Sequence, residues 1–164
     1  MKGRLLIIPL VMSFLIACSN QEQQASQGSH QEHEQSQTQN TGDIREEKAN
    51  VESLPRFFVK QPKEIQVIYQ AAANHKELLE KIPCYCRCGE SINHKNNYDC
   101  FVHENKEDGA VTWDDHGTKC DVCLKIAAQS VKDFDQGMSI KEIREKVDKT
   151  YQKGDANPTP IPEI

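Results

Sequence analysis

Three cysteines alternate within one short segment of the chain, Pro83-Cys84-Tyr85-Cys86-Arg87-Cys88-Gly89. Three more follow at Cys100, Cys120 and Cys123, so that six of the seven cysteines lie between positions 84 and 123. Alternate cysteines are too close in the chain to bridge one another without strain. Their sulfurs must therefore face distant cysteines or a metal ion.

Metal binding is the first interpretation of this pattern, because thiolates are soft ligands that suit Cu(I) or Zn(II). Cys-x-Cys presents two thiols from one turn of chain, and the Cys120-x-x-Cys123 pair at a helix start would place two thiols on one face. A helix N-terminus also lowers thiol pKa values and so favours the thiolate that metals need. We expect a copper or zinc ion held by these six cysteines, with further ligands available from His75, His94, His103 and His116.

Two other interpretations of the cysteines remain open. Six cysteines in an oxidising exterior favour three structural disulfides, although three bridges meeting on one seven-residue segment would be crowded. The Cys120-x-x-Cys123 pair is also typical of a redox couple, but the βαβ pattern of thioredoxin-like proteins is missing. We rank the disulfide-stapled module second and the redox protein third.

His75 requires a separate choice, because it lies in the apolar stripe of an expected helix. Its ring is either satisfied by a backbone carbonyl or reaches toward the cysteines as a ligand or the partner of a ligand.

The run Asp114-Asp115-His116-Gly117 is typical of a solvated turn rather than a catalytic cluster. The sequence shows no Ser/His/Asp constellation, phosphate loop or convincing carboxylate pair, so an enzyme is not expected.

The seventh cysteine, Cys18, ends a segment typical of lipoprotein export. Lys2 and Arg4 precede an apolar run that closes with Leu15-Ile16-Ala17-Cys18, like a bacterial lipobox. The run is too short to span a bilayer comfortably as a mature helix. We therefore expect cleavage of residues 1–17, lipidation of Cys18, and a protein anchored on the extracytoplasmic face of the cell membrane.

Charge and composition then divide the mature chain. Loss of two of the 20 basic residues with the signal segment lowers the formal net charge from −5 to −7, which disfavours nucleic acid as a partner. Residues 18–53 are rich in glutamine and serine and are expected to form a disordered tether. A cysteine-rich domain is expected over 54–153, followed by a disordered proline-rich tail over 154–164.

Three helices are expected within that domain. Apolar residues repeat at helical spacing from Ile65 to Ile82, between Pro62 and Pro83. A second helix begins near Thr118 and closes at Gly137, and a third opens with the capping box of Ser139 and Glu142. We see no convincing strand pair in the cysteine- and histidine-rich stretch between the first two helices. The sequence therefore predicts an all-α or mostly α domain with one long irregular loop.

The chain resembles the PCYCGC-motif family of bacterial lipoproteins. The resemblance is carried by the segment from Pro83 to Gly89 together with His94, Asp99-Cys100-Phe101, the Cys120/Cys123 pair and the 137–151 segment. Arg87 stands where the family motif has glycine, so this position does not require a glycine backbone. The resemblance implies a lipoprotein and, because the family has no assigned activity, it adds nothing on chemistry. The resulting hypothesis is a lipid-anchored protein that handles or buffers a thiophilic metal, with an envelope protein as a possible partner.

Overall fold

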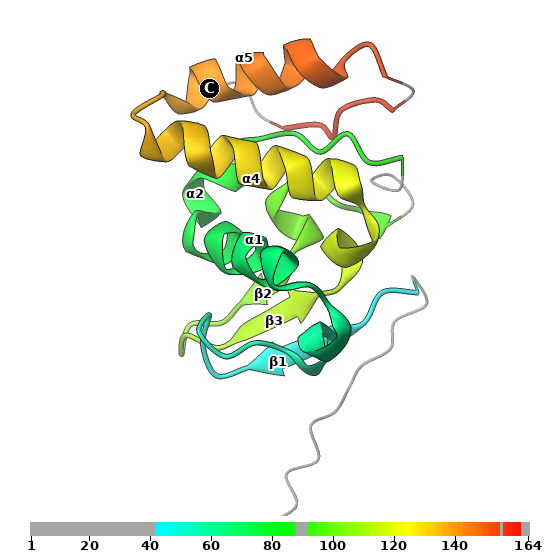
Figure 1. Ribbon diagram of the computed structural model, residues 1–164, viewed down its shortest axis with the longest axis vertical. Helices are drawn as coiled ribbons and strands as arrows, with labels where there is room; N and C mark the ends of the chain where they lie inside the picture. Colours follow the sequence, from blue (N-terminus) through cyan, green and yellow to red (C-terminus); the bar gives the residue numbers. More distant parts are fainter. Residues whose placement is uncertain (1–41, 88–91, 155, 162–164) are drawn as a thin grey trace, which may run out of the picture. The chain divides into compact units, whose positions relative to one another are not determined.

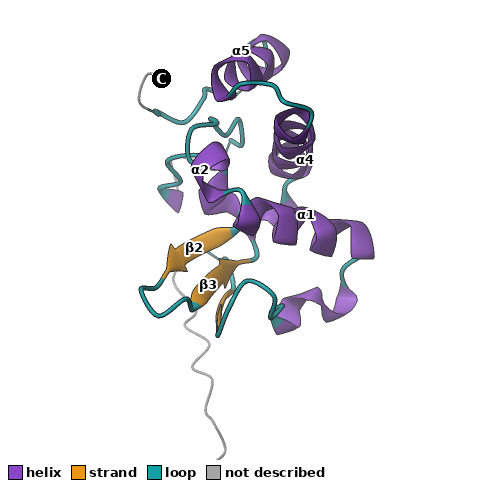
Figure 2. Cartoon of the chain, turned by 90° about the vertical axis from the view of Figure 1, so that its left-hand side faces the viewer, coloured by secondary structure: helices purple, strands orange, loops and turns teal. Residues whose placement is uncertain are grey.

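The computed structural model describes residues 42–87, 92–154 and 156–161 (Figure 1). They form strands, α-helices and short 3-10 helices (η) in the order β1 (Arg45–Lys48), η1 (Arg56–Lys60), α1 (Lys63–Asn74), α2 (Lys76–Leu79), η2 (Tyr98–Cys100), β2 (Val102–Asn105), β3 (Val111–Asp114), η3 (His116–Lys119), α4 (Asp121–Asp135) and α5 (Ile140–Tyr151). Both views show α1 between the sheet and α4, and α5 on the far side of α4 (Figures 1 and 2).

The expectation of an all-α domain is wrong, because the chain contains an antiparallel three-stranded sheet in the order β1-β3-β2 and is an α+β fold. Strands β2 and β3 form a hairpin whose turn includes Gly109 at φ 91°. The Lys106 N–H donates to the Ala110 carbonyl at 2.8 Å and closes this turn. Asp108-Gly109 is a strong hairpin signal, and it was missed because the flanking strands have only four residues each.

Strand β1 also moves the start of the folded domain from residue 54 into the expected tether. Its sequence, Arg-Glu-Glu-Lys, lacks the apolar alternation that indicates a strand. Instead, the buried Arg45 Nε lies 2.9 Å from Asp114 Oδ2, and residues 45–48 pair with β3. A buried ion pair of this kind is visible only once the two segments are side by side.

The expected turn at Asp114 and Asp115 is buried rather than solvated. The Asp115 carboxylate accepts a hydrogen bond from the Ile44 N–H at 2.8 Å and forms an ion pair with Lys119. The Asp114 carboxylate accepts from the His116 N–H at 2.9 Å. These contacts join the start of β1 to the η3 segment and fix the backbone of His116.

The helices follow the sequence pattern with one interruption. The stripe expected to run to Ile82 breaks at His75, where φ −118° and ψ 42° separate α1 from α2. Helix α4 begins at Asp121, and its N-cap is Cys120, two residues after Thr118. The capping box of Ser139 and Glu142 is confirmed at the start of α5, and Gly137 has the positive φ, 89°, of a residue that ends a helix. Within the described part of the chain, no helix has the length and apolar character that crossing a membrane would need.

Tyr69 of α1 ties the layers together from the centre of the core. Its ring packs edge-on against Phe58 and Phe101, with centroids 4.7 and 4.9 Å apart. Its hydroxyl donates to the Asp114 carbonyl at 2.9 Å and accepts from the Thr118 N–H at 3.0 Å. Helix α1 is thereby fixed to β3 and to the segment that leads into α4.

The segment after α5, expected to be disordered, returns to the cysteine motif. Thr159 is buried, and its hydroxyl accepts a hydrogen bond from the Cys84 N–H at 2.9 Å. In return the Thr159 N–H donates to the Cys84 carbonyl at 3.0 Å. The described part of the tail, residues 156–161, is therefore part of the domain that holds the cysteines.

Candidate metal centre

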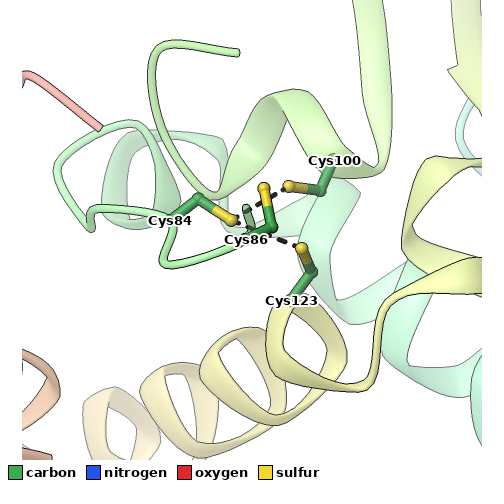
Figure 3. Close-up of side chains that lie close together, drawn as sticks. All are labelled: Cys84, Cys86, Cys100 and Cys123. Carbon is green, nitrogen blue, oxygen red and sulfur yellow. Dashed lines mark hydrogen bonds between the residues drawn. The ribbon is translucent and has the colours of Figure 1, made fainter. Parts of the chain in front are cut away.

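Four cysteine sulfurs converge at one buried point although they come from three separate segments (Figure 3). Cys84 and Cys86 lie on the irregular chain after α2, Cys100 ends η2, and Cys123 lies in the first turn of α4. Cys84, Cys100 and Cys123 have no exposed surface, and Cys86 is 6 % exposed. The sulfurs of Cys84 and Cys86 thus lie close to those of two distant cysteines, Cys100 and Cys123, and also close to one another.

The spacing of the sulfurs differs from that of disulfide bonds. Cys84 Sγ lies 3.4 Å from Cys100 Sγ and 3.3 Å from Cys123 Sγ, against about 2.05 Å in a disulfide. Sulfurs at the corners of a zinc tetrahedron with Zn–S of about 2.3 Å stand about 3.8 Å apart. All four sulfurs lie within 4.8 Å of one another. The arrangement is therefore closer to a tetrahedral thiolate site than to a pair of bridges.

Two of the four candidate histidines join this cluster. His94 Nδ1 lies 3.5 Å from Cys100 Sγ, and the rings of His94 and His116 meet edge to face at 4.8 Å. Both rings are buried, and in both the Nε2 atom has no hydrogen-bond partner among the described residues. Such buried polar atoms are rare without a partner, and a ligand is one explanation for them.

Cys120 approaches the cluster from its exposed side. Its sulfur lies within 4.8 Å of a ring nitrogen of His116 and of Cys123 Sγ. Unlike the other four described cysteines it is only partly buried. It lines a cavity of about 700 Å³ together with Asp43, Tyr85, Cys86, His116 and Tyr151.

The thiols of the cluster differ in their tendency to ionise. Hydrogen bonds from Cys100 and Cys123 hold the pKa of Cys86 far below its usual value, whereas burial raises the pKa of Cys100. Hydrogen bonding with Cys100 and the other thiols raises the pKa of Cys123. A hydrogen bond with Cys123 lowers the pKa of Cys120 to about 6. The two thiols whose pKa is lowered, Cys86 and Cys120, are thus the two that line the cavity.

The neighbours of His116 favour its protonated form. Burial alone would lower the pKa of His116, but its polar interactions with Cys86 and Asp43 raise that pKa to about 9. A metal ion would replace this proton, because a ligating imidazole must be neutral.

The structure does not bring every predicted ligand to this place. His75 Nδ1 lies 2.8 Å from the Ala71 carbonyl, which is the backbone-satisfied arrangement, and its Nε2 lies 3.5 Å from Asp135. His103 on β2 contacts the Arg45 guanidinium at 3.3 Å, and burial lowers the pKa of His103. Neither belongs to a potential metal-binding group among the described residues. Cys18 and Cys88 lie outside the described residues.

A family model described as "Protein of unknown function with PCYCGC motif" matches residues 7–164. The chain belongs to this family. Searches of curated proteins and of solved structures gave no match. In this chain the motif begins at Pro83, so its first two cysteines, Cys84 and Cys86, belong to the cluster.

Within the PCYCGC motif, the positions beside the two cysteines Cys84 and Cys86 differ in their surroundings. Tyr85 turns away from the sulfurs, stacks on Tyr151 at 5.8 Å and donates a hydrogen bond to Asp148 at 2.7 Å, so it fastens the motif to α5. Arg87, in place of glycine, is exposed and does not have a positive φ, which explains why this position accepts a side chain. Cys84 and Cys86 thus reach the cluster, while Tyr85 between them packs against α5.

Sequence reasoning missed two residues that support the centre. Asp43 Oδ2 lies 3.3 Å from His116 Nδ1, and Thr159 holds Cys84. Both lie in segments whose composition indicated disorder, and neither has a local signal that points to the cysteines. Only the pairing of β1 with β3 and the return of the C-terminal segment reveal them.

Proposed function

We propose that this protein binds Cu(I) or Zn(II) in the cysteine centre and handles or buffers that metal. The observation that carries the proposal is the convergence of Cys84, Cys86, Cys100 and Cys123, buried and within 4.8 Å of one another. Four thiols would not need to meet in a core merely to fill it, since sulfur packs equally well beside apolar side chains. Four soft donors at this spacing offer the ligand set that thiophilic metals prefer.

We further propose that the protein acts by binding and not by catalysis. A zinc site enclosed by four protein ligands leaves no position open for a substrate, and is typical of structural or storage sites. The anionic character of the chain disfavours nucleic acid as a partner. The remaining expected partners are the lipid membrane and another protein of the cell envelope.

Anchoring through Cys18 completes the proposal and has its own test. Cys18→Ser should abolish incorporation of radioactive palmitate and release the protein from the membrane fraction, because several acyl chains give stable anchoring. Undiminished label in this variant would contradict the lipobox interpretation.

Metal binding is tested by melting the reduced full-length chain with and without Cu(I) or Zn(II). Free metal at about 100 times its Kd stabilises a fold by about 2.7 kcal/mol. In a domain of this size that corresponds to a rise in Tm on the order of 10 °C. Cys100→Ser should remove this rise, and Cys100→Ser/Cys123→Ser should cost little more, because ligands of one site act as a unit.

Cys18→Ser is the matched control for metal binding, since it also removes one cysteine but none of the centre. It should keep the metal-dependent rise in Tm. The disulfide-stapled alternative predicts the opposite pattern: no rise with either metal and a large fall in Tm on adding reductant alone. That pattern would reject the metal proposal.

The exposure and the lowered pKa of Cys120 favour a second candidate function, thiol–disulfide exchange. Cys120 is partly exposed at the N-cap of α4, with a pKa lowered to about 6 by its hydrogen bond with the buried Cys123. This combination of a reactive thiol and a buried second thiol is found in dithiol oxidoreductases. This candidate would be favoured if the protein binds neither metal and if Cys120 and Cys123 form a reversible disulfide while a partner disulfide is reduced to two thiols.

A further inference from the structure

The described donors of the cluster exceed what one tetrahedral ion can use. Three overlapping groups of donor atoms, each within 4.8 Å, are formed by Cys84, Cys86, Cys100 and Cys123, by Cys86, His94, Cys100 and His116, and by His116, Cys120 and Cys123. Together they comprise seven side chains, whereas a tetrahedral zinc site takes four ligands. The first and third groups share a single member, Cys123, and a thiolate can bridge two metals when it has a second lone pair free.

His116 is oriented as a metal ligand by a carboxylate. Its Nδ1 lies 3.3 Å from Asp43 Oδ2, while its Nε2 is buried and has no hydrogen-bond partner among the described residues. Metal-ligating histidines usually bond a carboxylate or carbonyl through one ring nitrogen and the metal through the other. Lys119 also contacts Asp43, at 3.1 Å, and so holds the carboxylate in place.

The third group differs from the first in its access to solvent. The four-cysteine group is closed, with no member more than 6 % exposed. The third group contains the partly exposed Cys120 and borders the cavity of about 700 Å³, whose lining includes Tyr85, Val122 and Tyr151. Three protein ligands beside an open position are the arrangement found where a metal must exchange its fourth ligand.

We infer that His116, Cys120 and Cys123 hold a second metal ion, which shares the Cys123 thiolate with the ion of the four-cysteine group. This inference rests on the proposed function and adds to it an exchangeable position open to the cavity. Binding of the second ion displaces any proton on Cys120 and His116, while Cys123, already a thiolate on the first ion, donates a second lone pair, so that three metal–ligand bonds form without a change of oxidation state. A thiol-bearing ligand or partner can then complete the open coordination position.

The test counts metal ions on the reduced full-length chain, titrated separately with Cu(I) and Zn(II) under argon. Native mass spectrometry should show two ions per chain with the metal that binds, and X-ray absorption should show metal–metal scattering. Cys120→Ser should hold one ion and lose that scattering. Cys120→His should restore the second ion, because imidazole can replace the thiolate. Lys125→Gln is the control, because Lys125 is an exposed lysine of α4 whose Nζ lies 3.9 Å from Asp121 and which supplies no donor; this variant should bind two ions.

Any other number of bound ions would contradict the second metal position or the proposed function. One ion on both wild type and Cys120→Ser would overturn the second position and leave the proposed function standing. Two ions on both proteins would also overturn it, since the second ion would then lie elsewhere in the chain. No ion on wild type would reject the proposed function itself. If Cys120→Ser fails to fold, two ions on wild type without metal–metal scattering would still overturn the shared thiolate.

Discussion

Helix α5 carries its own start signal and follows the helix-ending Gly137, whereas the irregular segments that supply most of the cysteine centre carry almost none. The α5 capping box, the positive φ of Gly137 and the apolar stripes lie within about thirty residues of chain. The centre instead gathers donors from positions 84 to 123 on irregular chain, 3-10 helices and one helix start. A region of the first kind folds by local rules, while a region of the second kind depends on every layer around it.

The cysteine centre should therefore be more sensitive than α5 to substitutions elsewhere in the chain. His116 is placed by buried contacts to Asp43 and Asp114, which lie 73 and two residues away in sequence. Cys84 is placed by Thr159, 75 residues away. Because these supports are remote, small changes far from the sulfurs should reach the centre and leave α5 intact.

Metal removal should produce the largest difference in stability between the cysteine centre and α5. In the proposed metal-bound protein, chelation should raise amide hydrogen exchange around residues 84–87 and 98–119 by about 100-fold, which corresponds to loss of about 2.7 kcal/mol. Exchange in α5 should change much less, because α5 contacts the motif through Tyr85, which is not one of the donors. Hydrogen exchange read by mass spectrometry checks this, and an equal increase in every segment would contradict it.

Overpacking beside His116 should produce the next largest effect. A Cβ added at Gly117 would meet Phe101 Cε1 at 2.8 Å and the Tyr69 hydroxyl at 2.9 Å, so Gly117→Ala should cost about 1–3 kcal/mol. It should also weaken metal binding, because the shift reaches His116. A chemical denaturation curve and a competitive metal titration measure the two effects.

Gly137→Ala is the control for that variant. It has φ 89° and open space around it, so the cost is conformational, about 1–2 kcal/mol. Its metal affinity should equal that of wild type. Weaker metal binding in the Gly137 variant would mean that any loss of stability disturbs the centre.

The C-terminal contact should have a smaller effect. Thr159→Val keeps the shape of the side chain but leaves the buried Cys84 N–H without its acceptor, at a cost of about 1–2 kcal/mol. Metal affinity should fall as well, because Cys84 is then less well placed. Thr159→Ser retains the hydroxyl and should behave nearly as wild type. Equal metal affinity in the valine and serine variants would show that the tail does not support the centre.

Loss of the α5 cap should have the smallest effect and should spare the centre. Ser139→Ala removes the side chain that accepts from the Glu142 N–H, at a cost of about 1 kcal/mol. Metal stoichiometry and affinity should not change, whereas Ser139→Asp should retain most of the stability. A change in metal affinity in the alanine variant would connect α5 to the centre more closely than the contacts indicate.

The sequence alone determined the local features of this protein. The cysteine spacing predicted that sulfurs would face distant partners, and the capping residues predicted α5, because these signals act over a few residues. The family was also evident from the motif and the residues that follow it. Helix α1 was predicted at its start but not at its break, since nothing in the apolar stripe marks His75 as an end.

Only the tertiary structure decided which residues form the centre and which segments belong to the fold. Strand β1 and the segment around Thr159 have polar or proline-rich sequences with little local preference for order. They are ordered by a buried ion pair, backbone pairing and two hydrogen bonds to Cys84. Such interactions stabilise a segment only after a distant partner is in place, because the partner supplies both the burial and the missing hydrogen-bonding group.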